Sequence, residues 1–336
     1  MTKSPIFIGG TGRSGTSVVA RSLGQLPGVL FRVKENKLIS ERNGLRDLVE
    51  VLSGPSSPKS AHLAVRDFRD WARRLRRKGF QRDLVRRLDV SVGRRVASAI
   101  DRALGSDFTI FAVGECFGLT HYDQAINAFV DEIATVVRRP QIIETEGPVE
   151  EYFVPRSLTR SFYLEKSRAL LERLYAPLLV RAGAQRWCDD TPANALAAPF
   201  LFELYPSAVL LHVVRDPRDV VASYCRQKWA PSAPRLCTLQ VERFIKSWLQ
   251  IRDQLPKHQY VEVRLEDLVE RPEVEWGAIS AAIGTPIEPA SLSEIRRESS
   301  HLASYRQILT PSEAEYVEVR LGDWMREHGY LSSAAS

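Results

Sequence analysis

PIFIGGTGRSGTS, residues 5–17, is the stretch that decides the fold. It opens with an apolar run typical of a buried strand, continues through a turn rich in Gly, Ser and Thr, and leads into a helical pattern. A glycine-rich turn between a strand and a helix leaves the first backbone N–H groups of the helix available to bind an anion. The stretch therefore predicts an α/β fold with an anion site at the end of its first strand.

The spacing of this turn is close to that of the nucleotide-binding P-loop. Gly10 and Gly15 have the Gly-x-x-x-x-Gly spacing and Ser17 the hydroxyl position, but Thr16 stands where a nucleoside-triphosphate enzyme has lysine. Because that lysine reaches the β- and γ-phosphates, its absence indicates a different ligand, a 5′-phosphate or sulfate-bearing anion held without a metal. The alternative is a turn that binds nothing. The side chains offered to an anion are one cation and four hydroxyls, from Arg13, Thr11, Ser14, Thr16 and Ser17.

A second anion site is expected far downstream. Residues 209–214 form an apolar, β-branched run typical of a buried parallel strand, which ends at Arg215 before a helical pattern begins. Ser223 follows eight residues later, about two helical turns on, so that both side chains could reach one phosphate over the sheet edge. The alternative is a structural ion pair between Arg215 and Asp216, with Ser223 on the helix surface.

Together, four motifs resemble those of the sulfotransferases that use 3′-phosphoadenosine 5′-phosphosulfate (PAPS). They are GTGRSGTS at 10–17, DTP at 190–192, RDPRD at 215–219 with Ser223, and VRLEDL at 263–268. The resemblance covers residues 5–40 and 185–285, and implies a P-loop-like, three-layer α/β/α fold with a central parallel sheet and a helical insertion. It implies that Arg215 and Ser223 grip the 3′-phosphate of PAPS and that no metal takes part. The resemblance also implies that the 5′-phosphosulfate of PAPS is bound by Gly12, Arg13, Ser14, Gly15, Thr16 and Ser17.

Residues 29–37 are similar to the segment that carries the catalytic glutamate of the tyrosylprotein and glycosaminoglycan sulfotransferases. The resemblance implies that Glu35 is the general base, which accepts the proton of an attacking hydroxyl. Arg13 is then expected to stabilise the departing phosphate during an in-line transfer. The alternative is that Glu35 only pairs with a neighbouring lysine, Lys34 or Lys37, at a surface turn.

Two positions depart from the family pattern. Asp190 stands where many relatives have lysine before the Thr-Pro pair. Another basic residue, Lys34 or Lys37, could replace that lysine, or Asp190 could face a cationic part of the acceptor. The simplest expectation is that Asp190 or Thr191 caps a helix beginning near Pro192. Leu265 is the second departure, since some relatives have an aromatic residue there near the adenine, and no adenine contact is assigned.

The 336 residues, 44% of them hydrophobic, are expected to form one α/β domain over 1–336. A helical, Arg-rich insertion over about 53–150 is expected to cover the acceptor site. Within it, residues 66–95 carry twelve Lys or Arg against four Asp, although the net charge of the whole chain is only +6. This basic segment could attract an anionic acceptor or membrane surface, or form a solvated helical cap.

The acceptor is expected to be a hydroxyl-bearing small molecule, glycan, lipid or protein, and no nucleic-acid module accompanies the basic charge. The chain shows neither a secretory segment nor an apolar run of about 18 residues, so a cytoplasmic enzyme with free thiols is expected. An oxidising compartment could still bridge Cys225 and Cys237. Two rival functions stay open: a P-loop kinase acting on a small molecule, and a nucleotide sensor without catalysis.

Overall fold

The chain folds as two compact units, and the first contains the central sheet. The structure, a computed structural model, describes residues 3–76, 112–140, 149–227, 229–288, 295 and 302–332. The first unit comprises residues 1–34 and 181–336, and the second comprises residues 35–180.

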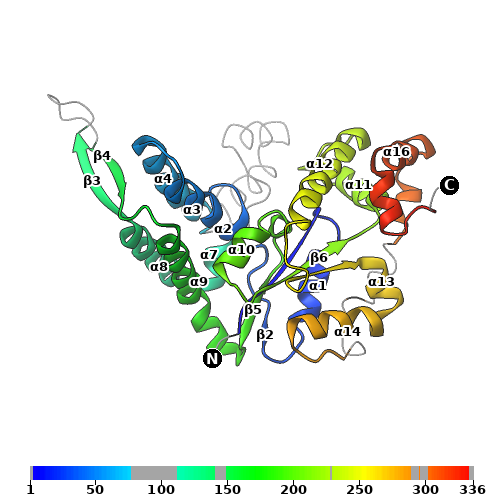
Figure 1. The fold of residues 1–336 in the computed structure, drawn as a ribbon, viewed down its shortest axis with the longest axis horizontal. Helices are drawn as coiled ribbons and strands as arrows, with labels where there is room; N and C mark the ends of the chain where they lie inside the picture. The colour runs from blue at the N-terminus through cyan, green and yellow to red at the C-terminus, as the bar shows by residue number, and fades with distance from the viewer. Residues whose placement is uncertain are drawn as a thin grey trace, which may run out of the picture. The chain divides into compact units, whose positions relative to one another are not determined.

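The sheet of the first unit has five parallel strands in the order β2-β5-β1-β6-β7 (Figure 1). All five residues of β1 are buried, as its apolar run predicts. The chain passes from β1 to one side of the sheet for β2 and β5 and to the other side for β6 and β7. Such a change of direction creates a ligand crevice at the carboxyl ends of the strands. The strands are β1 (Ile6–Gly10), β2 (Val29–Leu30), β5 (Arg186–Asp189), β6 (Val209–Val214) and β7 (Tyr260–Arg264).

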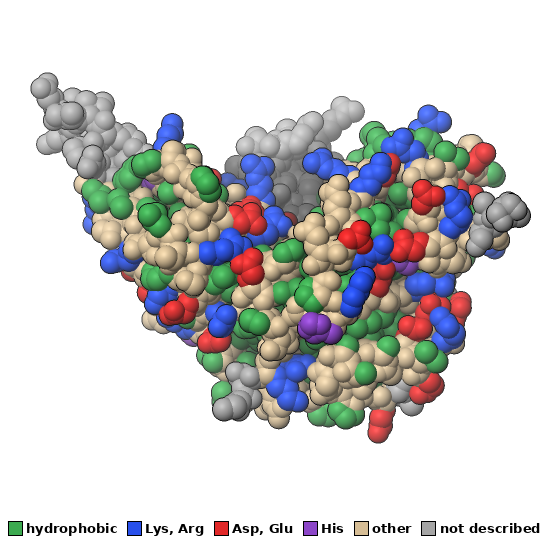
Figure 2. Space-filling view, in the orientation of Figure 1, with side chains coloured by type: hydrophobic (Ala, Val, Ile, Leu, Met, Phe, Trp, Pro, Cys, Tyr) green, Lys and Arg blue, Asp and Glu red, His purple; other side chains and the backbone are tan. Residues whose placement is uncertain are grey.

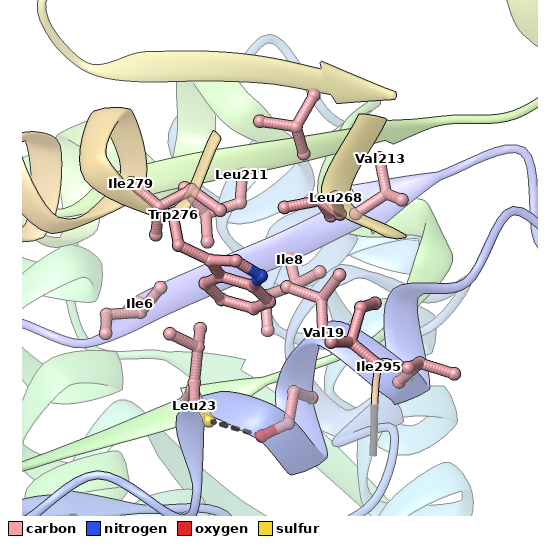
Figure 3. Packing of buried hydrophobic residues seen from close by; sticks show 14 of the residues in the cluster. Ile6, Ile8, Val19, Leu23, Leu211, Val213, Leu268, Trp276, Ile279 and Ile295 are labelled. Carbon is pink, nitrogen blue, oxygen red and sulfur yellow. Dashed lines mark hydrogen bonds between the residues drawn. The ribbon is translucent and has the colours of Figure 1, made fainter. Parts of the chain in front are cut away.

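Helices cover both faces of this sheet, which confirms the predicted α/β/α layers. Leu211 and Val213 of β6 pack in one apolar cluster with residues of α1 and α14, and Trp276 lies at its centre (Figure 3). His212, between them, stacks on Trp248 of α12 with ring centroids 4.1 Å apart. Because successive side chains of a strand point to opposite faces, α12 covers the face away from α1 and α14. The helices are α1 (Thr16–Leu23), α10 (Ala198–Leu204), α11 (Pro217–Cys225), α12 (Pro234–Arg252), α13 (Leu265–Glu270), α14 (Pro272–Ile283) and α16 (Pro311–Glu327), with 3-10 turns η1 (Pro192–Asn194) and η4 (Ser304–Gln307).

The second unit is mainly helical, and the expected insertion, about 53–150, falls within its span. Its core includes Phe68 and Phe129, whose rings meet edge to face at 5.2 Å. Of the basic segment 66–95, only residues 66–76 belong to the described part of the chain. Its elements are α2 (Lys37–Ser40), α3 (Leu45–Ser53), α4 (Pro58–Arg74), α7 (Val113–Phe117), α8 (Leu119–Ile133), the antiparallel pair β3 (Ala134–Pro140) and β4 (Val149–Pro155), and α9 (Arg160–Ala182), which runs on past the unit's last residue.

Lys and Arg side chains are interspersed with Asp and Glu on the face seen in Figure 2. Many charged side chains of the described residues are paired locally, as between Arg271 and Asp267 at 2.9 Å. All four cysteines are free thiols, as expected, although Cys225 Sγ lies only 3.7 Å from Cys237 Sγ. Among the described helices, none combines the length and the apolar character that crossing a membrane requires.

Candidate functional site

The turn between β1 and α1 has an unusual backbone. Gly12, Arg13 and Gly15 all have positive φ, at 72°, 59° and 104°. Glycine adopts this region readily, but Arg13 does so under strain of a kind that is common at ligand sites. Gly15 is the N-cap of α1 and makes no side-chain capping bond, so that no side chain at that position satisfies the first N–H groups of the helix. These N–H groups and the positive end of the helix dipole are the groups on which the expected anion site depends.

Gly12 is required for a second, steric reason. A Cβ added to Gly12 would lie 2.5 Å from the hydroxyl oxygen of Tyr224. That hydroxyl donates a hydrogen bond to the carbonyl oxygen of Thr11 at 2.6 Å, and thereby fastens the turn to α11. Tyr224 was not singled out from the sequence, because nothing in a local pattern shows a contact across 213 positions.

The structure brings the two expected anion sites into direct contact. Arg13 Nε donates to Ser223 Oγ at 3.0 Å, and Arg215 Nη1 donates to the carbonyl oxygen of Arg13 at 3.2 Å. The contacts arise because β1 and β6 are neighbours in register, with Gly10 opposite Val213. Arg13, Arg215 and Ser223 thus form one polar cluster at the carboxyl ends of two adjacent strands.

The ionic partner of Arg215 is Asp219, with Nη2 and Oδ2 3.5 Å apart. The alternative pairing with Asp216 is not formed. Asp216 instead accepts a hydrogen bond from the backbone N–H of Arg218 and pairs with the Arg218 guanidinium at 2.6 Å. It is therefore the N-cap of α11, while Arg215 is directed toward the turn after β1.

Two serines of the turn have different surroundings. Ser17 Oγ donates its single proton to Asp190 Oδ2 at 2.6 Å. Ser14 Oγ is buried, and among the described residues it has no hydrogen-bond partner. A buried hydroxyl without a partner costs about 1–3 kcal/mol, so Ser14 is the better placed of the two to donate to a bound anion.

The prediction that Asp190 or Thr191 caps a helix at Pro192 is wrong. The segment is the short 3-10 turn η1, and its N-cap residue Thr191 makes no side-chain capping bond. Thr191 Oγ1 donates to Asp189 at 3.0 Å, and Asn194 Nδ2 donates to Asp189 at 2.8 Å. Asp189, Thr191 and Asn194 thus hydrogen-bond to one another in the interior. Asp190 instead accepts the hydrogen bond of Ser17, at the start of α1.

Glu35 belongs to the second unit, where it has a positive φ of 46°. Its carboxylate lies 3.4 Å from Lys37 Nζ, so the pairing with a neighbouring lysine does form. The pair is not at an exposed turn, because the side chains of Lys37 and Glu35 are only 7% and 19% exposed.

The segment around Glu35 is held by two helices. Trp71 Nε1 of α4 donates to the carbonyl oxygen of Lys37 at 3.0 Å, and Asn36 Nδ2 donates to the hydroxyl oxygen of Tyr175 in α9 at 3.2 Å. Asn36 also caps α2 by accepting from the N–H of Leu38. The segment that carries Glu35 is thus held at several points within the second unit.

One group of possible metal ligands occurs in the described part of the chain: Glu262, Glu327 and His328. Glu262 is already used by internal hydrogen bonds from His212 Nδ1 and Trp248 Nε1, both at 2.8 Å, and by His328 at 3.1 Å. Burial acts to raise the pKa of Glu262, but the hydrogen bonds from His212 and His328 outweigh it and hold that pKa below its usual value. The carboxylate of Glu262 is thus occupied by side chains of the protein itself.

A family model described as "Sulfotransferase family" matches residues 5–289, which is most of the chain. The chain belongs to the sulfotransferase family. The matched range includes both expected anion sites and Glu35. The last helix, α16, lies after the matched range. No curated protein sequence matches this sulfotransferase.

Several solved structures are similar to this sulfotransferase. The sulfotransferase domain of the Synechococcus olefin synthase is 13% identical with a TM-score of 0.43, covering 95% of this chain and 94% of that one. The sulfotransferase domain of the curacin biosynthetic pathway is 15% identical with a TM-score of 0.46, covering 96% and 99%. The sulfotransferase STF9 from Mycobacterium avium is 14% identical with a TM-score of 0.44, covering 97% and 77%.

Proposed function

We propose that this sulfotransferase moves the sulfuryl group of PAPS to a hydroxyl group of its acceptor. The observation that carries the proposal is the cluster in which Arg13 contacts Ser223 and Arg215. Two guanidinium groups and a helix N-terminus gathered at adjacent strand ends suit a nucleotide with negative groups at both its 3′ and 5′ positions.

Each end of the nucleotide has its own set of groups. The backbone N–H groups of the turn after β1 and the Ser14 hydroxyl bind the 5′-phosphosulfate, and Arg215 with Ser223 binds the 3′-phosphate. Arg13 is exposed and shares its Nε–H with Ser223. Donor binding exchanges that hydrogen bond for contacts of both side chains with the nucleotide.

The transfer is a single in-line displacement. The acceptor oxygen forms a bond to sulfur while the bond from sulfur to the bridging oxygen of the 5′-phosphate breaks, and Glu35 takes the acceptor's proton. The electron pair of the broken bond leaves with 3′-phosphoadenosine 5′-phosphate (PAP), whose new charge Arg13 stabilises. Fixed donors and correct positioning supply most of the acceleration in such transfers, and no metal is assigned a part.

The acceptor class follows from the chemistry only as far as its hydroxyl group. A small molecule, glycan, lipid or protein side chain can each supply a hydroxyl group that a carboxylate base deprotonates. Incubating the full chain with sulfur-labelled PAPS and extracts of its host, and then isolating the labelled product, identifies the acceptor directly.

The Ser17–Asp190 hydrogen bond favours a second candidate, a P-loop kinase. In P-loop enzymes that cleave nucleoside triphosphates, magnesium is held by the loop hydroxyl and by an aspartate, and here β5, which leads to Asp190, is a neighbour of β1. Thr16 in place of lysine opposes this function. Calorimetric titration of the full chain with PAP and with ATP plus magnesium separates the two. Tighter binding of ATP with magnesium would overturn the PAPS proposal.

Replacing Glu35 by Gln tests catalysis separately from donor binding. We expect PAP affinity to stay within about twofold and turnover to fall about a hundredfold or more, because the base is lost while the shape is kept. Glu50→Gln is the matched control, since Glu50 is an exposed carboxylate of the same unit. Unchanged turnover in Glu35→Gln would remove Glu35 from the base role, and absence of any transfer by the wild type would favour a nucleotide sensor.

A further inference from the structure

Asp219 is a buried carboxylate that the reaction as proposed does not use. It lies in the first turn of α11, and its side chain is only 1% exposed. Burying a charge is costly unless it is paired and hydrogen-bonded, so the partners of this carboxylate show what it is for.

Four groups surround the Asp219 carboxylate. Three come from one segment of the C-terminal region: the backbone N–H groups of Ala303 and Tyr305, both at 2.8 Å, and the Ser304 hydroxyl at 3.2 Å. The fourth is Arg215 Nη2 at 3.5 Å. Asp219 therefore acts as a capping group for η4 from another part of the chain, and at the same time fixes one edge of the Arg215 guanidinium.

The 303–305 segment depends on this anchor. Ala303 has a φ of 55°, a conformation that costs a non-glycine residue roughly 1 kcal/mol or more and persists only where surrounding contacts hold it. The Arg218 guanidinium covers the Tyr305 ring at 4.5 Å, so that α11 holds this segment by a second contact. The segment is thus fixed against the helix that carries Ser223.

Both terminal nitrogens of Arg215 are in turn engaged by the protein. Its Nη2 faces Asp219, and its Nη1 donates to the carbonyl oxygen of Arg13 in the turn after β1. A guanidinium is a rigid planar fork, so contacts at both terminal nitrogens fix its orientation before a ligand arrives. Fixing a side chain in its binding geometry lowers the entropy lost on binding.

We propose that Asp219 is a positioning residue that gives this sulfotransferase its selectivity for a 3′-phosphorylated nucleotide. It does so by orienting Arg215 and by holding the 303–305 segment beside it. The inference rests on the proposed function, because it assigns Arg215 to the 3′-phosphate.

An opposing effect makes the inference testable. A carboxylate near an anion site repels any bound phosphate, so an effect of charge alone would make Asp219→Asn bind PAP and adenosine 5′-monophosphate (AMP) more tightly. The orientation of Arg215, by contrast, affects only the affinity for PAP, because AMP has no 3′-phosphate. The ratio of the two affinities therefore distinguishes positioning from plain electrostatics and from a general loss of structure.

The experiment measures the Kd of PAP and of AMP by calorimetry for the full-length wild type and for Asp219→Asn. We expect the PAP preference to fall roughly tenfold in Asp219→Asn, about the loss of one charge-assisted hydrogen bond, with AMP affinity unchanged. Asp216→Asn is the matched control. Asp216 lies in the same turn and pairs with Arg218, so the same substitution there should leave the ratio at its wild-type value.

Ser304→Ala keeps the test decisive if Asp219→Asn fails to fold. It removes one of the four groups around the carboxylate, and we expect a two- to threefold loss of PAP preference. An unchanged ratio in the folded variants, or equal changes for PAP and AMP, overturns the inference while the proposed function stands. A wild type without PAP preference overturns both.

Discussion

The turn after β1 and the turn after β6 lie at the ends of neighbouring strands, yet they offer an anion different groups. In the first, the N-cap is Gly15 without a side-chain bond, so the helix N–H groups are left for a ligand. In the second, the Asp216 side chain caps α11, and the proposed function assigns binding to the side chains of Arg215 and Ser223. In the proposed function, the same strand-turn-helix arrangement therefore binds through the backbone in one turn and through side chains in the other.

The difference shows which substitutions each turn tolerates. A turn that binds through its backbone depends on glycine and on left-handed conformations, because a Cβ changes the path of the chain. A turn that binds through side chains depends on the identity and orientation of those side chains, and its helix can be capped independently. The predictions below test this division, from the largest expected effect to the smallest.

Arg13→Ala should have the largest effect, because Arg13 is the one cationic side chain of a turn that otherwise binds through its backbone. We expect kcat to fall about a hundredfold or more, the usual cost of losing one donor to a developing charge. Single-turnover kinetics with labelled PAPS measure this loss. Arg226→Ala is the control, an exposed arginine at the end of α11. A variant with normal kcat would show that the backbone alone stabilises the leaving phosphate.

Arg215→Ala should act on binding more than on turnover. We expect PAP affinity to fall roughly thirtyfold, or about 2 kcal/mol, while AMP affinity stays within about twofold. The reason is that only the 3′-phosphate requires the side chain of the second turn. Equal losses for PAP and AMP in calorimetric titrations would mean that Arg215 supports the first turn through its bond to Arg13 instead.

Gly12→Ala tests the backbone side of the comparison. A Cβ at a φ of 72° and 2.5 Å from the Tyr224 hydroxyl forces the turn to move, at a cost of about 1–2 kcal/mol. We expect PAP and AMP affinities to fall together, because both nucleotides carry the 5′-phosphate. Removing the obstructing hydroxyl with Tyr224→Phe in the same chain should recover part of the loss. Full activity of Gly12→Ala would contradict a backbone-based site.

Asp216→Ala should give the smallest effect. The N-cap bond of α11 is worth about 1 kcal/mol, which for a chain of this size lowers Tm by a few degrees in thermal unfolding. Since the 3′-phosphate is assigned to the side chains of Arg215, directly after β6, and Ser223 of α11, and not to the N-terminus of α11, the ratio of PAP to AMP affinity should not change. A large loss of PAP affinity at unchanged Tm would show that the N-terminus of α11 takes part in binding, as the N-terminus of α1 is proposed to do.

Several features of the site could be predicted from the sequence because they depend on neighbours along the chain. The apolar run before Gly10 and the one before Arg215 form strands, and the glycines of the first turn adopt positive φ. The capping prediction at Pro192 failed because propensity treats Thr191 as isolated, whereas its hydroxyl is turned to donate to Asp189 and makes no capping bond. The alternative interpretation placed the pair of Glu35 and a lysine at a surface turn, yet Lys37 is buried, since burial depends on which helices pack there.

The sequence by itself determined that strand, turn and helix follow one another twice, with Arg13 in one turn and Arg215 at the start of the other. Only the tertiary structure decided that Arg13 meets Ser223, that Ser17 gives its proton to Asp190, and that Asp219 is the ionic partner of Arg215. Two of these three contacts join residues more than 170 positions apart. They exist because β5, β1 and β6 are adjacent in the sheet, and strand order is fixed by the packing of the whole unit and not by any local pattern.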